Sequence, residues 1–94
     1  MEKEKIIVPR GSLDFYKYEK DGLMYYEFDA TRCSPPEPMV NAIAGLSLLK
    51  EANERLVGLF FHVPSPLFAR IGDEFSYEIN ELDSGDIRVE FKIP

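Results

Sequence analysis

Alternation of apolar and polar residues is clearest in the C-terminal part of the chain. Residues 75–79 and residues 87–93 both place apolar side chains at every second position, which is typical of a strand with one buried face. Between them, residues 83–86 read Asp-Ser-Gly-Asp, a composition that favours a turn. The pattern therefore predicts a β-hairpin in this part of the chain.

Upstream of this hairpin lie a long apolar run and an amphipathic segment. The run from Arg55 to Val63 predicts a strand that is buried on both faces near the centre of a sheet. The amphipathic segment predicts a helix with one face on that sheet, because its apolar residues recur at helical spacing. Gly45 in this helix costs about 1 kcal/mol relative to alanine, which indicates a close approach of the backbone there. The apolar positions of the helix are Met39, Ile43, Leu46 and Leu49.

Two segments have the residues of helix N-termini. In residues 34–38, we expect the Ser34 hydroxyl to accept a backbone N–H bond and Glu37 to reach back to the Ser34 amide. Pro35 suits the first helical position. Pro38 lacks an N–H, so the regular helix is expected to begin a residue or two later. Residues 65–72 combine a serine cap, an early proline, an apolar turn and a final glycine, which predicts a second, short helix.

The N-terminal part of the chain is rich in aromatic residues. Residues 23–30 predict a strand that is bounded by a glycine before it and by a cluster of prolines after it. Residues 6–8 and 13–18 predict two further short strands. The Asp21-Gly22 dipeptide predicts a turn that joins the second of these to the strand at residues 23–30.

The order of these elements predicts the fold class, which is α+β. From residue 23 onward the order is strand, helix, strand, short helix, strand, strand. This order predicts a two-layer α/β sandwich whose mixed sheet is covered on one face by two helices, with a right-handed crossover through the first helix. We expect residues 23–94 to form this domain and residues 1–22 to form an N-terminal extension that adds a strand or a hairpin.

Composition and charge narrow the function classes. The 94 residues suffice for one hydrophobic core, and the hydrophobic fraction is 45%. A net charge of −6 disfavours binding to nucleic acid, which depends on clustered Lys and Arg. No apolar run approaches the roughly 20 residues that span a bilayer, so we expect no membrane role. The single cysteine and the charged residues 2–5 favour a reducing cytoplasm over secretion.

Residues 29–39 read Asp-Ala-Thr-Arg-Cys-Ser-Pro-Pro-Glu-Pro-Met, between a predicted strand and a predicted helix. With the element order, this segment resembles the TusA-like (SirA-like) sulfur carriers, in which a strand leads into a Cys-Pro-x-Pro motif at a helix start. The resemblance runs from about Leu23 to the C-terminus and implies the β-α-β-α-β-β fold of that superfamily. Asp29 matches the leading aspartate of the motif, and residues 36–38 match its Pro-x-Pro.

The segment departs from the carriers at two positions. Pro35 stands where the carriers have their persulfide-bearing cysteine, and Arg32 stands where their loop has a glycine. The sequence is more similar to a branch of the superfamily known only as a domain of unknown function, which reads Pro-Pro-Glu-Pro here. Residues 62–67 and 75–78 resemble further signatures of that branch. Because the persulfide-bearing cysteine is replaced, we expect no catalytic residue and no cofactor, but a non-catalytic module that binds another protein or a small ligand.

Cys33 supports the main alternative, a sulfur-carrier function. A helix N-terminus and the neighbouring Arg32 would favour the thiolate form of Cys33, which is the form that accepts sulfur as a persulfide. The opposing interpretation is a small buried side chain, which is the commoner role of a free cysteine.

His62 is the only histidine, and it ends the long apolar strand before a proline-rich loop. Ligands often bind beyond the carboxyl ends of strands in α/β folds, so His62 is a candidate contact to a ligand, a metal or a haem group. No spacing of Cys and His supplies further metal ligands, and we therefore expect no metal site. The competing interpretation is a loop histidine that hydrogen-bonds to the backbone.

Carboxylates complete the expected binding region. Glu37 has a competing structural role in a rigid helix start, and the two carboxylates of Asp29 and Glu37 alone do not make a catalytic set.

By the two-residue period of a strand, either Tyr25 or Tyr26 is expected to face away from the helices. An aromatic patch there would mark an interaction site or a homodimer interface, unless the N-terminal extension covers it. The expected binding residues are Asp29, Arg32, Cys33, Glu37 and His62.

Overall fold

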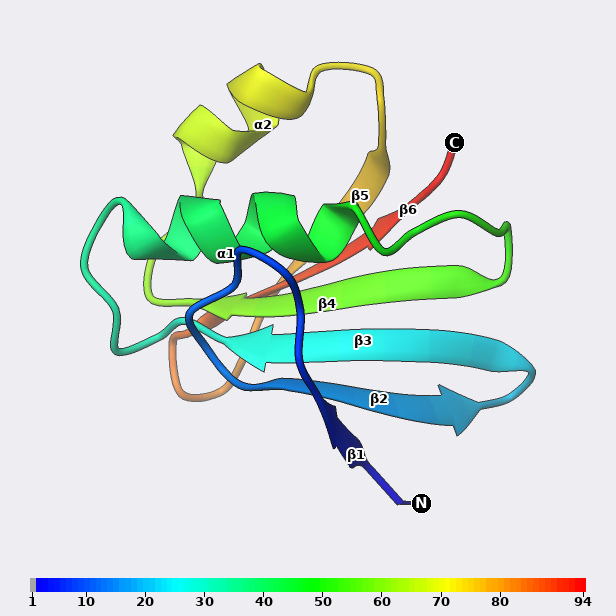
Figure 1. Ribbon diagram of the computed structural model, residues 1–94. Coiled ribbons are helices and arrows are strands. Elements are labelled where there is room, and N and C mark those ends of the chain that lie inside the picture. Colours follow the sequence, from blue (N-terminus) through cyan, green and yellow to red (C-terminus); the bar gives the residue numbers. More distant parts are fainter. Residues whose placement is uncertain (1) are drawn as a thin grey trace.

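Six strands form one mixed sheet, and both helices cover the same face of it (Figure 1). This arrangement, seen in a computed structural model that describes residues 2–94, confirms the predicted two-layer α/β sandwich. In chain order the elements are β1 (Glu4–Ile6), β2 (Phe15–Lys20), β3 (Leu23–Asp29), α1 (Glu37–Leu46), β4 (Glu54–Phe60), α2 (Ser65–Ile71), β5 (Ser76–Glu81) and β6 (Ile87–Lys92).

The strand order across the sheet is β1-β2-β3-β4-β6-β5. The β3–β4 pair is parallel and is connected through α1, whereas every other neighbouring pair is antiparallel. The apolar run thus forms an inner strand, β4, and the predicted C-terminal hairpin is β5–β6, as expected. The turn from β2 to β3 has positive φ at Asp21 (54°) and Gly22 (80°), which confirms the predicted turn.

The N-terminal extension adds two strands to the same sheet. The second, β2, pairs with β3 along its whole length. The first lies earlier than residues 6–8, because β1 ends at Ile6 while Val8 points into the core in the loop that follows. An edge strand of charged residues such as β1 has no alternation that would mark it in the sequence.

The core lies between the helices and the sheet. Phe15, Phe28, Phe60 and Phe91 are each at most 2% exposed, and the Phe28 ring lies 5.0 Å from that of Phe15 and 5.7 Å from that of Phe60. A Cβ atom at Gly45 would lie 2.7 Å from Leu56 Cδ1 and 2.9 Å from Phe15 Cε2. The predicted close approach of α1 to the sheet is therefore confirmed.

The predicted helix caps are wrong. Helix α1 begins at Glu37 and α2 at Ser65, and neither has a side-chain cap. The Ser34 carbonyl accepts the Glu37 N–H (3.0 Å), while the Glu37 carboxylate accepts the Ser12 hydroxyl (2.6 Å). The Glu37 carboxylate, which was expected to bond to the Ser34 amide, thus bonds instead to the hydroxyl of Ser12 in the N-terminal extension. The later helix start expected from Pro38 is confirmed.

One polar side chain is fully buried in α1. The amide oxygen of Asn41 accepts the backbone N–H groups of Ser12 (2.8 Å) and Leu13 (3.0 Å). Its amide nitrogen donates to the Ser12 hydroxyl and to the Glu37 carbonyl, both at 2.9 Å. Asn41 therefore fastens the β1–β2 loop to the start of α1, a role that the sequence analysis did not identify.

The other face of the sheet carries aromatic and charged side chains. Tyr25 lies there, stacked on Tyr18 with ring centroids 5.1 Å apart, whereas Tyr26 packs against the core on the helix side. The extension also reaches this face, because Lys3 Nζ lies 4.9 Å from the Tyr18 ring centroid and 3.0 Å from Glu27 Oε2. The prediction that one of the two tyrosines faces away from the helices is confirmed for Tyr25.

Candidate functional site

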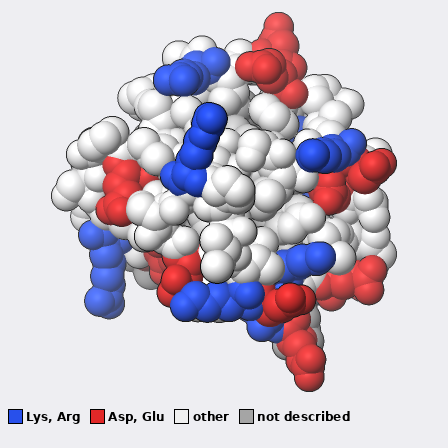
Figure 2. All heavy atoms as spheres, viewed as in Figure 1, with Lys and Arg blue, Asp and Glu red and all other residues white. Residues whose placement is uncertain are grey.

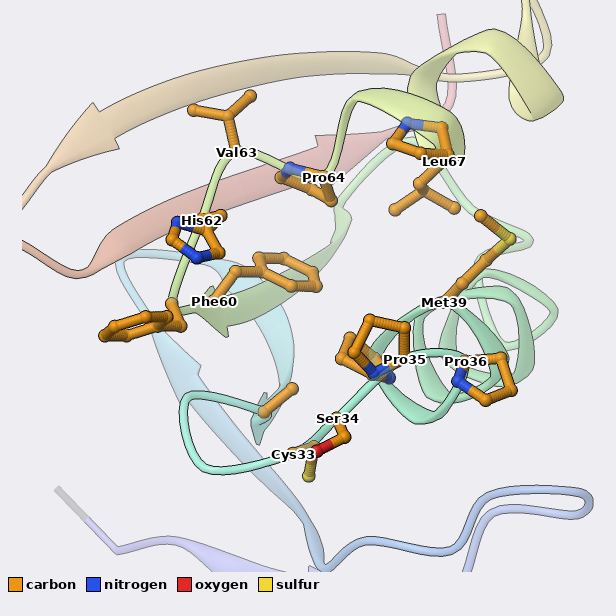
Figure 3. Close-up of a pocket in the computed structure, with 14 residues that line it drawn as sticks. Cys33, Ser34, Pro35, Pro36, Met39, Phe60, His62, Val63, Pro64 and Leu67 are labelled. Atoms are coloured by element: carbon orange, nitrogen blue, oxygen red, sulfur yellow. The ribbon is translucent and has the colours of Figure 1, made fainter.

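A cavity of about 450 Å³ lies beyond the carboxyl ends of the parallel strands β3 and β4 (Figure 3). Ala30 and residues 33–36, from the connection between β3 and α1, form one wall, and residues 61–64, which connect β4 to α2, form the opposite wall. We call this cavity the apolar pocket. It forms here because two neighbouring parallel strands end at the same edge of the sheet and their connections diverge, α1 starting from one and α2 from the other.

The lining of the apolar pocket is almost entirely hydrophobic. Phe60 and Leu67 form its base and are at most 2% exposed. Its walls contain five prolines, which contribute ring carbons and no backbone N–H donors. The only polar side chains in the lining are Cys33, Ser34 and His62. Such a composition suits an apolar molecule that carries few polar groups. The prolines are Pro35, Pro36, Pro38, Pro64 and Pro66.

His62 lies at the rim of the apolar pocket, directly after β4 (Figure 3). Its ring is exposed and contacts the Phe61 ring edge-on, with centroids 4.5 Å apart. None of the residues 2–94 hydrogen-bonds to the His62 ring, so the interpretation of a loop histidine bonded to the backbone is wrong. Both ring nitrogens are thus free to meet a polar group of a bound molecule.

Cys33 is partly buried, close to the carboxylates of Glu37 and Asp29. Burial raises the pKa of the Cys33 thiol, and the carboxylates of Glu37 and Asp29 raise it further. The Ser12 hydroxyl and the Cys33 thiol in turn lower the pKa of the Glu37 carboxyl. The surroundings of Cys33 therefore favour the protonated thiol, which is the opposite of what a nucleophilic cysteine requires.

A second hollow of about 550 Å³ lies on the other side of Cys33 and has charged walls. Asp29 and Arg32 line this charged hollow together with Lys3, Asp14 and Glu27. The Asp29 carboxylate accepts two bonds from Thr31, one from the backbone N–H (2.9 Å) and one from the hydroxyl (2.6 Å), and so shapes its own loop.

The five expected binding residues therefore separate into two places. His62 and Cys33 share the apolar pocket, whereas Asp29 and Arg32 share the charged hollow with Cys33. Glu37 lines neither cavity and contacts Cys33 and Ser12. The apolar walls that give the pocket its character were not among the expected binding residues, although the prolines of both loops were visible in the sequence.

Residues 2–94 contain neither a metal-binding cluster nor a membrane-spanning helix. No group of three or more His, Cys, Asp or Glu residues in this part of the chain is arranged to hold a metal ion. No helix among these residues is both long and apolar enough to cross a bilayer. In Figure 2, Lys and Arg are interspersed with Asp and Glu mainly around the outline of the molecule, and most of the centre of this face is uncharged.

Comparison with known proteins gives no assignment. No family model, no curated protein and no solved structure matches the chain. The resemblance to the TusA-like carriers therefore stays a prediction based on residues 29–39 and on the element order.

Proposed function

We propose that this chain is a non-catalytic binding module whose apolar pocket holds a small, largely apolar ligand. The observation that carries the proposal is the cavity of about 450 Å³ with its apolar walls at the carboxyl ends of β3 and β4. Cavities of roughly 300–1,000 Å³ with apolar walls and a few polar groups are typical of small-molecule sites. The expected ligand has a ring or a branched aliphatic body and one polar group that reaches His62.

The proline content of the walls supports this function. Proline has a fixed φ and little freedom to lose, so walls built from it need little ordering when a ligand binds. The exposed rings at the rim add contact area, because Phe61 is 61% exposed and lies beside His62. A ligand that enters the pocket would cover part of this ring and remove apolar surface from water.

The sulfur-carrier alternative has less support. The pKa of the Cys33 thiol is raised by burial and by the carboxylates of Glu37 and Asp29, so the thiol stays protonated. A thiol in that state accepts a persulfide sulfur slowly at neutral pH, because the thiolate is the reactive form. The single free cysteine still favours a reducing compartment, and we propose the cytoplasm as the location.

Amide chemical shifts measured during titration with benzoate and benzyl alcohol test the proposal. We expect both probes to shift amides in residues 30–36 and 61–67, and we expect His62→Ala to weaken benzoate more than benzyl alcohol. Ser34→Trp should fill the pocket and abolish both responses. Ser47→Trp is the matched control, because Ser47 is exposed at the far end of α1.

Two results would contradict the proposal. One is the absence of shifts at residues 30–36 and 61–67 with either probe. The other is binding that Ser34→Trp and Ser47→Trp reduce equally, since the bound probe would then lie outside the pocket. A probe that shifts the exposed Phe61 and Val63 alone would point to a surface for a protein partner rather than to a ligand site.

A further inference from the structure

The two edges of the sheet differ in how they are protected. β1 is three residues long, and Lys3, Lys5 and Pro9 lie in or near it. Short length, lysine and proline all discourage pairing with another strand. β5 has none of these features: it is six residues long, contains no proline or lysine, and pairs with β6 without a bulge. Five of its six residues are exposed, so β5 presents an open edge.

The hydrogen-bonding groups on this open edge can be assigned. The Leu82 N–H donates to the Asp86 carbonyl (2.8 Å), in line with the β5–β6 register. In an antiparallel pair, residues alternate between facing the partner strand and facing away. Ser76, Glu78 and Asn80 therefore direct their backbone groups toward β6. The backbone groups of Tyr77, Ile79 and Glu81 face outward.

Symmetry selects one register for pairing of this edge with itself. Antiparallel pairing centred on Ile79 places Ile79 opposite Ile79 of the second copy and Tyr77 opposite Glu81. All three outward-facing residues of each strand then find backbone partners. Centring on Glu78 instead would leave Glu81 unpaired and would bring two Glu78 carboxylates face to face, which is unfavourable.

The side chains of β5 suit the register centred on Ile79. Ile79 is 44% exposed, and its contact with Ile79 of the second copy would bury both side chains on the helix side of the sheet. Glu78 lies opposite Glu90 within its own chain, and Glu90 is already paired with Arg55 (3.7 Å) and Arg88 (3.2 Å). Glu78 itself forms no ion pair among residues 2–94. In the dimer, Asn80 of the second copy lies opposite Glu78, so the Asn80 amide can donate a hydrogen bond to the Glu78 carboxylate.

We propose that β5 pairs with β5 of a second copy of this chain, antiparallel and centred on Ile79. The pairing would join the two sheets of six strands into one continuous sheet with all four helices on the same side. Strand pairing over six residues makes a smaller interface than the roughly 1,200 Å² of a standard complex. The dimer is therefore concentration-dependent, and salt strengthens it by screening the charge of −6 on each chain.

Sedimentation equilibrium across micromolar to millimolar concentrations tests the pairing. The expected mass rises from 10.8 kDa toward twice that value as the concentration increases. Ile79→Lys should keep the protein monomeric, because two ammonium groups would meet at the centre of the interface. Ile7→Lys is the matched control: Ile7 is 96% exposed in the β1–β2 loop, so the same change there should leave the dimer intact.

Disulfide cross-linking tests the register in a Cys33→Ala background. Two Ile79 Cα atoms opposite each other lie about 5.5 Å apart, within the range of a disulfide. Two Asn80 Cα atoms would lie about 8 Å apart, because they are offset along the strands. Mild oxidation should thus cross-link Ile79→Cys efficiently and Asn80→Cys poorly. A monomer at every concentration, a dimer that survives Ile79→Lys, or equal cross-linking at both positions would overturn the proposal.

Discussion

The two faces of the sheet exclude water by different means. On the helix side, large apolar rings such as Phe28 pack under α1 and α2, and the one buried polar side chain, Asn41, has four hydrogen bonds. On the other side, which carries tyrosines and paired charges, residues 2–94 form no helix, yet Val57 is fully buried. Close packing of large side chains excludes water from the helix side, whereas hydrogen bonds and ion pairs between long side chains exclude it from the other side.

The polar side chains on the face of Val57 come from β2, β3, β4 and β6. The Tyr18 hydroxyl donates to Glu27 (3.0 Å), and Arg55 lies 3.7 Å from Glu90. Long amphipathic side chains can cover apolar surface with their carbon atoms while their polar ends stay in water. Burial on a one-sided sandwich therefore does not require a second layer of helices. Because the two faces exclude water by different means, mutations and pH should affect them differently.

The largest effect is expected from Phe28→Ala on the helix side. Removing a fully buried ring that touches Phe15 and Phe60 should lower the free energy of unfolding by about 3–5 kcal/mol. Urea unfolding followed by circular dichroism measures the loss. Ile7→Ala is the control and should change stability by less than about 0.5 kcal/mol, because Ile7 is exposed. A small loss for Phe28→Ala would mean that this face does not depend on volume.

Asn41→Ala should have the next largest effect on the helix side. The change leaves the Ser12 and Leu13 N–H groups without their acceptor, and unsatisfied groups of this kind cost about 1–3 kcal/mol. We expect faster hydrogen exchange at these two amides, together with a stability loss of about 2 kcal/mol. Asn41→Asp is the control, because it keeps the shape of the side chain and its acceptor oxygens. Unchanged hydrogen exchange at Ser12 and Leu13 in Asn41→Ala would contradict the role of Asn41.

Val57→Ala measures how rigid the layer on the other face is. The loss of two buried carbons at about 0.8 kcal/mol each predicts a decrease of about 1.5 kcal/mol in the free energy of unfolding. If the polar side chains settle into the space, the decrease will be smaller than this. A loss above 3 kcal/mol would instead show that this layer resembles a packed core, and the contrast between the two faces would fail.

Tyr18→Phe should have the smallest effect at neutral pH, about 1 kcal/mol for the lost bond to Glu27. The pKa of Tyr18 is raised from 10.0 to about 12, mainly by burial and in addition by the hydrogen bond and charge of Glu27. The folded state therefore holds this proton more tightly than the unfolded state. The resulting stability is fully present below pH 10 and is lost as the pH rises toward 12.

Parallel unfolding curves of the parent protein and Tyr18→Phe from neutral to alkaline pH measure this contribution. The difference in stability between the two proteins should shrink as the pH passes from 10 toward 12. A difference that stays constant over this range would show that Tyr18 ionises as it does in the unfolded chain.

Local patterns were enough to predict most of the sheet and the packing of α1. Alternation identified β5 and β6, and the Asp21-Gly22 pair identified the turn after β2. Gly45 indicated the close contact with the sheet, since its cost in a helix has to be offset by packing. These features depend on residues that are close in sequence or on a single backbone property.

Contacts between distant segments could not be predicted in the same way. Ser12 and Glu37 are 25 residues apart in sequence, and their bond displaced the expected cap. Asn41 looks like an exposed polar position in an amphipathic helix until the β1–β2 loop is folded over it. Asp29 and His62 are likewise separated because the segment after β3 lines both cavities: Asp29 and Arg32 line the charged hollow, whereas residues 33–36 line the apolar pocket with His62.

Asn41 also bears on how the chain unfolds. Detachment of the segment before β3 would leave the buried Asn41 amide in α1 without the Ser12 and Leu13 N–H groups that it binds. It would also remove the Phe15 ring from beside Gly45. The segment therefore cannot fray from the folded protein at little cost, as a loosely attached terminus would. Melting of the N-terminal strands should coincide with melting of the rest, so that heat capacity shows one cooperative transition across the whole chain.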